Sequence, residues 1–210
     1  MIRLLIADDH PIVREGLRRI VAEHSDMRLV DEAVDGQDVM AKLKAADVDV
    51  LLLDVNMPGP GFLNTLRRVT SERPDIRVLV LSVHPEDQFG VRSLRAGAAG
   101  YLTKERTPEE LVEAIRRVHR GGKYITPALA ESMAFHLGTN VEAPPHELLS
   151  DREFEVLGML GSGRSVTEIA AHLTLSPKTV STYKTRVLEK LKLKNGAALI
   201  RYTLEHGLVD

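Results

Sequence analysis

The chain has no cysteine among its 210 residues. Without thiols there is no disulfide framework, no thiolate metal site and no cysteine nucleophile, so redox chemistry on cysteine is excluded. The same absence fits a reducing compartment, and we expect a cytoplasmic protein.

Long hydrophobic runs are also missing. No stretch approaches the roughly 18 uncharged apolar residues that a membrane-spanning helix needs. The opening residues, MIRLLIADDH, reach two aspartates without the basic lead or small-residue cleavage site of an export signal. We therefore expect a soluble, unexported protein with no membrane partner. Hydrophobic residues make up 43% and charged residues 28% of the chain, a globular mixture that excludes wholesale disorder.

Charge separates the chain into two parts. Residues 1–149 hold 19 Lys and Arg against 23 Asp and Glu, whereas residues 150–210 hold 9 against 7. Within residues 176–194, six basic residues stand against Glu189 alone. Such a stretch is typical of a surface that approaches nucleic-acid phosphates, and equally typical of a solvated helix face.

The first part alternates short apolar runs with helix-length amphipathic patterns. The apolar runs cover residues 3–7, 28–34, 48–55, 77–83 and 99–103. The helical patterns cover residues 12–21, 37–45, 61–73, 86–96 and 108–120. Strands that alternate with helices favour a parallel sheet, because each parallel connection crosses over through a helix. We predict an α/β fold with a doubly wound, five-stranded parallel sheet and helices on both faces.

The alternation stops at Gly121. The sequence over residues 121–148 is rich in turn-forming residues and holds one short helical pattern at residues 128–136, which indicates a linker. Four helical patterns and no strand follow, at residues 151–161, 166–173, 177–191 and 196–205. The predicted domains are residues 1–120, a linker over 121–148, and an all-α domain over 149–210.

Polar side chains cluster at the ends of the predicted strands. They are Asp8 and Asp9 after the first run, Asp54 in the third, Ser82 in the fourth and Lys104 after the fifth. The carboxyl ends of parallel strands meet at one edge of the sheet, where ligands bind. Three neighbouring carboxylates repel one another unless a hard cation with oxygen ligands neutralises them, which favours Mg²⁺. With Mg²⁺ and an ammonium opposite, a carboxylate oxygen of the central Asp54 can attack a phosphoryl group.

Each of these residues also has an ordinary structural role. Asp8 and Asp9 can cap the following helix, Ser82 can occupy a turn, and Lys104 can be a surface lysine. Together, five suitable residues at four strand ends favour the joint site. A metal-dependent phosphate-ester hydrolase is the competing function, but no further base is evident near Asp54 and the C-terminal part does not predict a substrate pocket.

The same residues carry a family resemblance. Asp8-Asp9, the run LLLDVNMPGPG around Asp54, Ser82, and GYLTK ending in Lys104 resemble the receiver domain of bacterial response regulators. The resemblance covers residues 1 to about 120 and implies a flavodoxin-like fold of five strands and five helices. It also implies that Asp54 accepts a phosphoryl group from the phosphohistidine of a sensor histidine kinase. No enzymatic activity is implied beyond this self-transfer and slow autodephosphorylation.

The receiver resemblance assigns roles to single residues. It implies that Mg²⁺ is held by Asp9, Asp54 and the backbone carbonyl of Asn56, with Asp8 acting mostly through water. It implies that Ser82 and Lys104 assist at the phosphoryl group and that Tyr101 is the aromatic switch residue.

Glu105 and His84 lie close in sequence to residues of the predicted site. Many receivers have a cis proline after the lysine, but Glu105 follows Lys104 here. A non-proline cis bond costs roughly 2.5 to 4 kcal/mol, so we expect a trans bond. His84, two residues past Ser82, either gates access to the site or is a solvated loop histidine.

The C-terminal helical patterns predict a helix-turn-helix. Ser150 with Glu153 predicts a capping box, and Ser176 before Pro177 predicts an N-cap. Only three residues separate the second helix from the third, which is the short connection of a helix-turn-helix. In the third helix, the residues expected to face inward are Val180, Val187, Leu191 and, in part, Tyr183, and those expected to face outward are Lys178, Ser181, Thr182, Thr185 and Arg186. Short hydroxyl and basic side chains suit DNA, although a helical hairpin that docks a protein has the same spacing.

Residues 149–195, beginning LSDREFEVL, are similar to the LuxR-type effector domain. The two domains together resemble a NarL/FixJ-type response regulator over nearly the whole chain. The resemblance implies that bases are read by Ser181, Thr182 and Thr185 and that the DNA backbone is met by Lys178, Thr179, Lys184 and Arg186. It also implies a dimer contact through residues 196–205. Ser181, Tyr183 and Gly196 replace a common lysine, histidine and arginine, which changes the expected base sequence and phosphate contacts.

The sequence therefore predicts a two-component response regulator. It would bind double-stranded DNA as a homodimer on repeated half-sites once a histidine kinase phosphorylates Asp54, with RNA polymerase as a further partner. A constitutive DNA-binding protein with a vestigial receiver is the alternative, and the complete set of five site residues argues against it.

Overall fold

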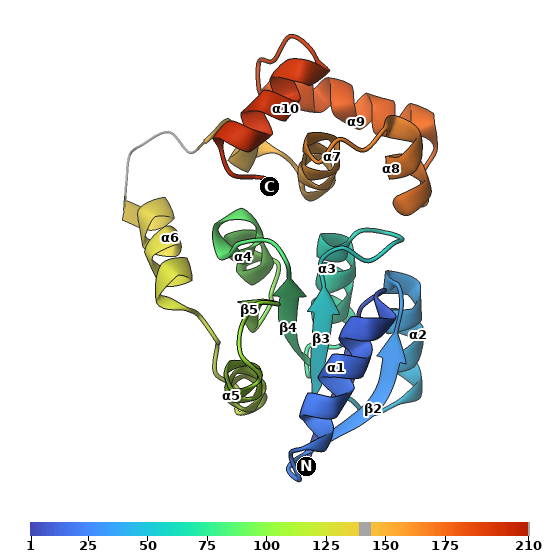
Figure 1. Cartoon of the computed structure of the whole chain (residues 1–210), viewed down its shortest axis with the longest axis vertical. Coiled ribbons are helices and arrows are strands. Elements are labelled where there is room, and N and C mark those ends of the chain that lie inside the picture. Colours follow the sequence, from blue (N-terminus) through green and yellow to red (C-terminus); the bar gives the residue numbers. More distant parts are fainter. Residues whose placement is uncertain (139–143, 210) are drawn as a thin grey trace. The chain divides into compact units, whose positions relative to one another are not determined.

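The computed structural model describes residues 1–138 and 144–209, without the side chains of residues 87, 88 and 135–138. The chain divides into two compact units, Met1–Met133 and Ala134–Asp210 (Figure 1). No helix in the described part is both long and apolar enough to cross a membrane.

The first unit contains five parallel strands in the order β2-β1-β3-β4-β5. The strands are β1 (Ile2–Ala7), β2 (Met27–Ala33), β3 (Val50–Asp54), β4 (Arg77–Ser82) and β5 (Gly100–Thr103). The helices between and after them are α1 (Pro11–Ala22), α2 (Gly36–Ala45), α3 (Phe62–Glu72), α4 (Glu86–Arg95) and α5 (Pro108–His119). This order confirms the predicted doubly wound fold, and the direction of winding reverses between β1 and β3, where such sheets bind ligands.

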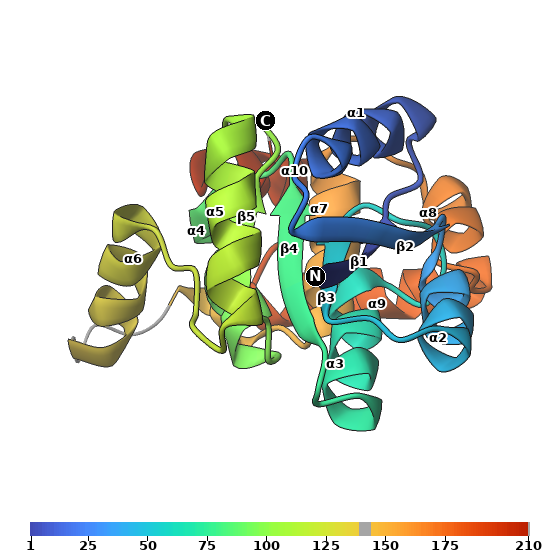
Figure 2. The ribbon, with the colours of Figure 1, turned by 90° about the horizontal axis from the view of Figure 1, so that it is seen from below.

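Helices on both faces bury the sheet. On one face, α1 and α5 contact each other (Figure 2) and cover the alternate strand residues that point to that face. Leu4 and Leu52 of the strands pack there with Leu17 of α1 and Ile115 of α5. Helices α2 and α3 contact each other on the other face. Burying one leucine or isoleucine side chain stabilises the fold by about 1.5–3 kcal/mol. Strand β3 is buried along its whole length and is apolar except at its last residue, Asp54.

Arg3 and Asp49 form an ion pair at the end of the sheet where β1 and β3 begin, and we expect it to stabilise the fold. Asp49 accepts hydrogen bonds from the backbone nitrogen and the guanidinium of Arg3 at 2.7–3.0 Å, which lower the pKa of Asp49 to about 2. Because Arg3 is partly solvated, we expect Asp49→Asn to lower the free energy of unfolding at pH 7 by about 1–2 kcal/mol. The folded-state pKa is depressed, so this contribution is lost as the pH falls from about 4 towards 2.

Urea denaturation at several pH values measures this effect. The matched control is Asp47→Asn, because Asp47 also pairs with Arg3, at 3.1 Å, but its side chain is 84% exposed. A difference between wild type and Asp49→Asn that stays constant down to pH 3 would contradict the assignment.

The second unit is helical. Its elements are the 3₁₀ turn η1 (Pro145–Leu148) and helices α7 (Asp151–Gly161), α8 (Val166–His172), α9 (Pro177–Lys190) and α10 (Gly196–Glu205), with no strand among residues 144–209. Ser150 and Glu153 form the predicted capping box, and Ser176 caps α9 as predicted. The four predicted helices are confirmed.

The segment between the two sets of helices holds one more helix, α6 (Pro127–Gly138), at the predicted place. The turn-rich part of the predicted linker lies partly outside the described residues. Tyr124 pairs with Gly100 of β5, so the first unit continues past residue 120. The domain limits 1–120 and 149–210 stay predictions.

Candidate functional site

The predicted acidic residues meet at the carboxyl edge of the sheet. Asp8 and Asp9 follow β1, and Asp54 is the last residue of β3. One potential ligand atom from each of Asp8, Asp9, His10 and Asp54 lies within 4.8 Å of all the others. Sequence reasoning missed His10, whose one signal was its position directly after the two aspartates. The structure thus shows a cluster consistent with a metal site.

Lys104, directly after β5, joins this cluster. Its Nζ lies 2.6 Å from Asp8 Oδ2 and 3.0 Å from Asp54 Oδ1. The other Asp8 oxygen accepts a hydrogen bond from the His10 backbone nitrogen at 2.9 Å. Asp54 is only 1% exposed, yet apart from this ion pair with Lys104 its carboxylate oxygens accept no hydrogen bond from the described residues. Of the two fully buried carboxylates, Asp8 and Asp54, Asp54 therefore has more unused acceptor capacity.

The charges of the cluster shift its titration. Burial raises the pKa of Asp54 above its ordinary value, and the carboxylates of Asp8 and Asp9 add to this rise although Lys104 opposes it. Burial alone would lower the pKa of Lys104, but Asp54 and Asp8 more than offset it, so the pKa is raised. A buried carboxylate with excess negative charge around it gains from a hard cation, and all-oxygen ligands are what Mg²⁺ prefers.

The end of β4 lies beside this cluster. The hydroxyl of Ser82 accepts a hydrogen bond from the His84 backbone nitrogen at 3.0 Å, and the hydroxyl of Tyr101 donates one to the His84 carbonyl at 2.9 Å. Ser82 and Tyr101 are both fully buried. The backbone of His84 is therefore held between the two residues expected to act as a switch.

The ring of His84 is not simply solvated. It is half-buried, lies 3.4 Å from the side-chain amide of Asn56, and tilts against Phe89 at 5.1 Å between ring centroids. The peptide bond between Lys104 and Glu105 is trans, as expected.

Helix α9 of the second unit shows the predicted faces. Val180, Val187 and Leu191 are buried and Tyr183 is half-buried. The exposed residues are Lys178, Ser181, Thr182, Thr185 and Arg186, and the half-buried ones are Thr179 and Lys184. The hydroxyls of Thr182 and Thr185 donate to backbone carbonyls one turn earlier in the helix, which fixes their positions on its outer face. The outward residues therefore form one continuous polar and basic surface.

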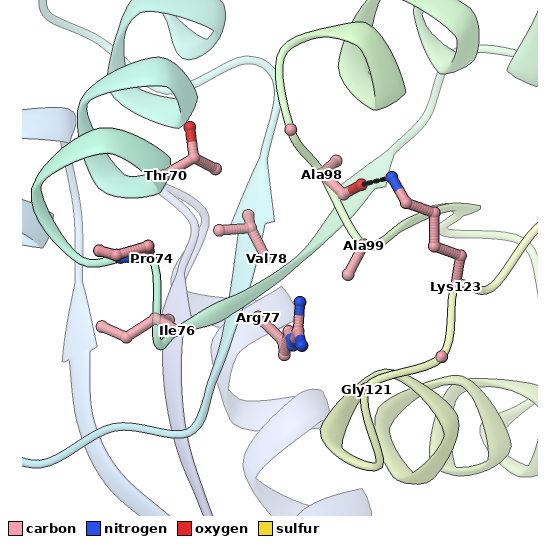
Figure 3. A pocket seen from close by; sticks show the side chains of 11 residues that line it. Thr70, Pro74, Ile76, Arg77, Val78, Ala98, Ala99, Gly121 and Lys123 are labelled. Atoms are coloured by element: carbon pink, nitrogen blue, oxygen red, sulfur yellow. Dashed lines mark hydrogen bonds between the residues drawn. The ribbon is translucent and has the colours of Figure 1, made fainter.

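A small pocket lies at the other end of β4 and β5. Its volume is about 180 Å³, and Figure 3 shows Thr70, Arg77, Ala99 and Lys123 around it, with the Lys123 ammonium donating to the Ala98 carbonyl. None of the predicted site residues lines this pocket. The acidic cluster and this pocket are thus separate features at opposite ends of the sheet.

Comparison with known families identifies both units. Residues 4–116 match the response regulator receiver domain, and residues 147–203 match the luxR family of bacterial regulatory proteins. The chain is a two-component response regulator with a LuxR-type DNA-binding domain. This family consists of transcription regulators and not of catalytic enzymes, which excludes the hydrolase alternative.

The regulator has relatives that match it along its whole length. Response regulator GacA of Pseudomonas viridiflava is 40% identical over 211 residues, which cover 100% of this chain and 99% of GacA. A structure of RcsB from Salmonella typhimurium has a TM-score of 0.78 at 28% identity and covers 97% of each chain. RcsB has also been solved on promoter rprA with the phosphomimetic BeF₃⁻; this structure has a TM-score of 0.70 at 26% identity and covers 96% of this chain and 97% of RcsB. A structure of two RcsB dimers on two parallel DNAs has a TM-score of 0.61 at 28% identity and covers 97% of this chain and 98% of RcsB.

Proposed function

We propose that Asp54 accepts a phosphoryl group from a phosphohistidine of a sensor histidine kinase and thereby controls DNA binding by α9. The observation that carries this proposal is the buried Asp54 carboxylate: its Oδ1 forms an ion pair with Lys104 Nζ at 3.0 Å, and its Oδ2 accepts no hydrogen bond from the described residues. A nucleophile needs such free lone pairs, and a developing phosphoryl charge needs such a cation.

The chemistry is a direct transfer. A carboxylate oxygen of Asp54 forms a bond to phosphorus, and the bond from phosphorus to the imidazole nitrogen of the donor histidine breaks, with the electron pair leaving on that nitrogen. The Lys104 ammonium offsets charge on the phosphoryl oxygens. Among the described residues, the Ser82 hydroxyl accepts a hydrogen bond from the His84 backbone nitrogen and donates none. Its proton is therefore available to a phosphoryl oxygen.

The acidic cluster would hold Mg²⁺. Asp9, Asp54 and the backbone carbonyl of Asn56 would bind the ion, which supplies neutralising charge when bound. Both Asp8 oxygens already accept hydrogen bonds, from Lys104 and from the His10 backbone nitrogen, so Asp8 would act through water.

We infer that phosphorylation changes the surface around α4 through Ser82 and Tyr101, since both bond to the backbone of His84 just before that helix. The expected result is a homodimer that places two α9 helices on repeated half-sites of double-stranded DNA. Helix α10 supports this, because Ile200 and Leu204 are exposed one turn apart on it, 40% and 53% respectively. The RcsB dimers on DNA are a precedent in a relative. We also propose that the bound dimer recruits RNA polymerase to the DNA. The proposed place of action is the cytoplasm.

Incubation with acetyl phosphate and Mg²⁺, followed by intact-mass and peptide mass spectrometry, tests the proposal. A stable adduct on Asp54 is expected. Continuous release of phosphate without an adduct would contradict Asp54 as a stable phosphoryl acceptor, and no reaction would indicate a vestigial receiver that binds DNA constitutively.

We propose different roles for the outer residues of α9, which gives a further prediction. Thr182→Ala should relax the preference at one or two base pairs, because a short side chain on the outer face reads base edges. Lys184→Ala should weaken binding to all sequences alike and lower the slope of log affinity against log salt by about one unit, because a phosphate contact releases a counterion. Titration of each variant with specific and random DNA at several salt concentrations measures both. Equal effects of the two changes on both DNAs would contradict this division.

A further inference from the structure

Residues 124–129, which we call the clasp, fasten the chain after α5 to two different elements of the receiver. The first attachment is to β5, the edge strand of the sheet. Tyr124 pairs in parallel with Gly100, and its backbone nitrogen donates to the Ala99 carbonyl at 2.9 Å. A Cβ at Gly100 would lie 2.8 Å from the Tyr124 carbonyl oxygen, so this close approach requires glycine. The start of the clasp is therefore fixed to the sheet.

The second attachment is a buried hydrogen bond to α4. The hydroxyl of Thr126 donates to the carboxylate of Glu86, the first residue of α4, and both side chains are at least nine-tenths buried. The same hydroxyl accepts from the Leu129 backbone nitrogen at 3.2 Å and thus caps the start of α6. Glu86 also accepts from Arg106 at 3.3 Å. A buried carboxylate without such partners is costly, so this bond resists being broken.

The third attachment is an apolar contact in the middle of α4. Leu129 is fully buried, and a Cβ at Gly90 would lie only 2.7 Å from Leu129 Cδ1. Glycine is unfavourable inside a helix, and here its missing side chain makes the space that Leu129 fills. Leu129 and Gly90 therefore fit as a knob and a hole between α6 and α4.

These three attachments span the joint between α4 and β5. Only Ile125 separates Tyr124, which pairs with β5, from Thr126, which bonds to Glu86, so the clasp is too short to let α4 and β5 move apart. Any displacement of α4 along or away from β5 must break the Thr126–Glu86 bond or withdraw Leu129 from Gly90. The carbonyl of His84 accepts a hydrogen bond from the Tyr101 hydroxyl, and α4 begins two residues after His84. A movement of the proposed switch residue Tyr101 would therefore reach α4 before any other helix.

We propose that the clasp is a built-in brake: it stabilises the unphosphorylated position of α4 and so opposes activation. This inference rests on the proposed phosphorylation of Asp54. By linkage, weakening a contact made only in the inactive state tightens binding of every ligand that favours the active state. The clasp thereby sets the threshold for activation.

The test uses the full chain and BeF₃⁻ with Mg²⁺, and follows the bound BeF₃⁻ by ¹⁹F NMR. Leu129→Ala removes the knob, and Thr126→Val removes the hydroxyl at nearly constant volume. Each should lower the half-saturating BeF₃⁻ concentration about fivefold or more, within the usual range of coupling between sites. Thr126→Ser keeps the hydroxyl and should match wild type. Leu148→Ala, the same change at a leucine that is 70% exposed, is the control for Leu129→Ala.

Amide hydrogen exchange of α4 without BeF₃⁻ separates the two proposals. Both clasp variants should exchange faster in α4 than wild type. If wild type binds BeF₃⁻ and both variants bind it with unchanged affinity, the brake is refuted while the function of Asp54 stands. If wild type does not bind BeF₃⁻, the proposed function fails, and unchanged exchange in α4 of the variants then overturns the clasp as well. Should Leu129→Ala fail to fold, Thr126→Val decides alone.

Discussion

The Asp54→Asn variant will take up no phosphoryl group from acetyl phosphate, whereas wild type will take up one. Asparagine keeps the size of the side chain but replaces the nucleophilic carboxylate with an amide, which does not attack phosphorus under these conditions. The loss should be complete, because Asp54 is the one carboxylate of the cluster that combines full burial with an oxygen, Oδ2, that accepts no hydrogen bond from the described residues. Intact-mass spectrometry after the reaction measures it.

Stability provides the control for this variant. Burial and the neighbouring carboxylates raise the pKa of Asp54, so its ionised form destabilises the folded state at neutral pH. Asparagine removes that charge, and the variant should be at least as stable as wild type at pH 7 in urea denaturation. Asp75→Asn makes the same substitution at a residue that is 61% exposed and should leave phosphorylation unchanged. Phosphoryl uptake by Asp54→Asn would show that another residue is the acceptor.

Most of the fold could be predicted because its signals are local. The buried run VLLLD of β3 ends in a charged residue, and the helices before and after it, α2 and α3, repeat apolar residues at three-and-four spacing. The N-caps at Ser150 and Ser176 set the beginnings of α7 and α9 to the residue, since a capping side chain bonds within its own first turn. Parallel topology then brings Asp8, Asp54 and Lys104 to one edge.

What sequence reasoning could not supply depends on tertiary contacts. Leu129 belongs to a segment with turn-rich neighbours, and its buried side chain fills the space at Gly90, about forty residues earlier in the chain. Likewise, Asp8 and Asp9 are adjacent in sequence but differ in the structure: Asp8 is 1% exposed and bonded to Lys104, whereas Asp9 is 32% exposed. Neither the burial of Leu129 nor that of Asp8 has a local signal in the sequence, because each depends on contact with a residue distant in the chain.

The second large effect expected is on assembly and DNA affinity. The phosphorylated protein should be a dimer that binds its operator about 5 to 150-fold more tightly than the unphosphorylated protein, the usual range for coupling between two sites. Small shifts around α4 can have this effect because packed surfaces tend to switch between two states. Two α9 helices on one face of DNA must lie about one turn, roughly 34 Å, apart, so the operator should hold two half-sites about ten base pairs apart.

Light scattering and DNA titration on the same sample, with and without phosphorylation, measure the two quantities together. The double variant Ile200→Ala, Leu204→Ala removes the exposed apolar pair of α10 and leaves the acidic cluster intact. It should take up phosphate at Asp54 as wild type does, yet lose the gain in DNA affinity, because the proposed dimer contact on α10 is gone. The converse pattern is expected of Asp54→Asn, which keeps the apolar pair but cannot be phosphorylated and should bind DNA only at the weaker, unphosphorylated level. A fully phosphorylated wild type that stays monomeric, with unchanged affinity for its operator, would refute control by dimerisation and leave recruitment of a partner as the role of the phosphorylated receiver.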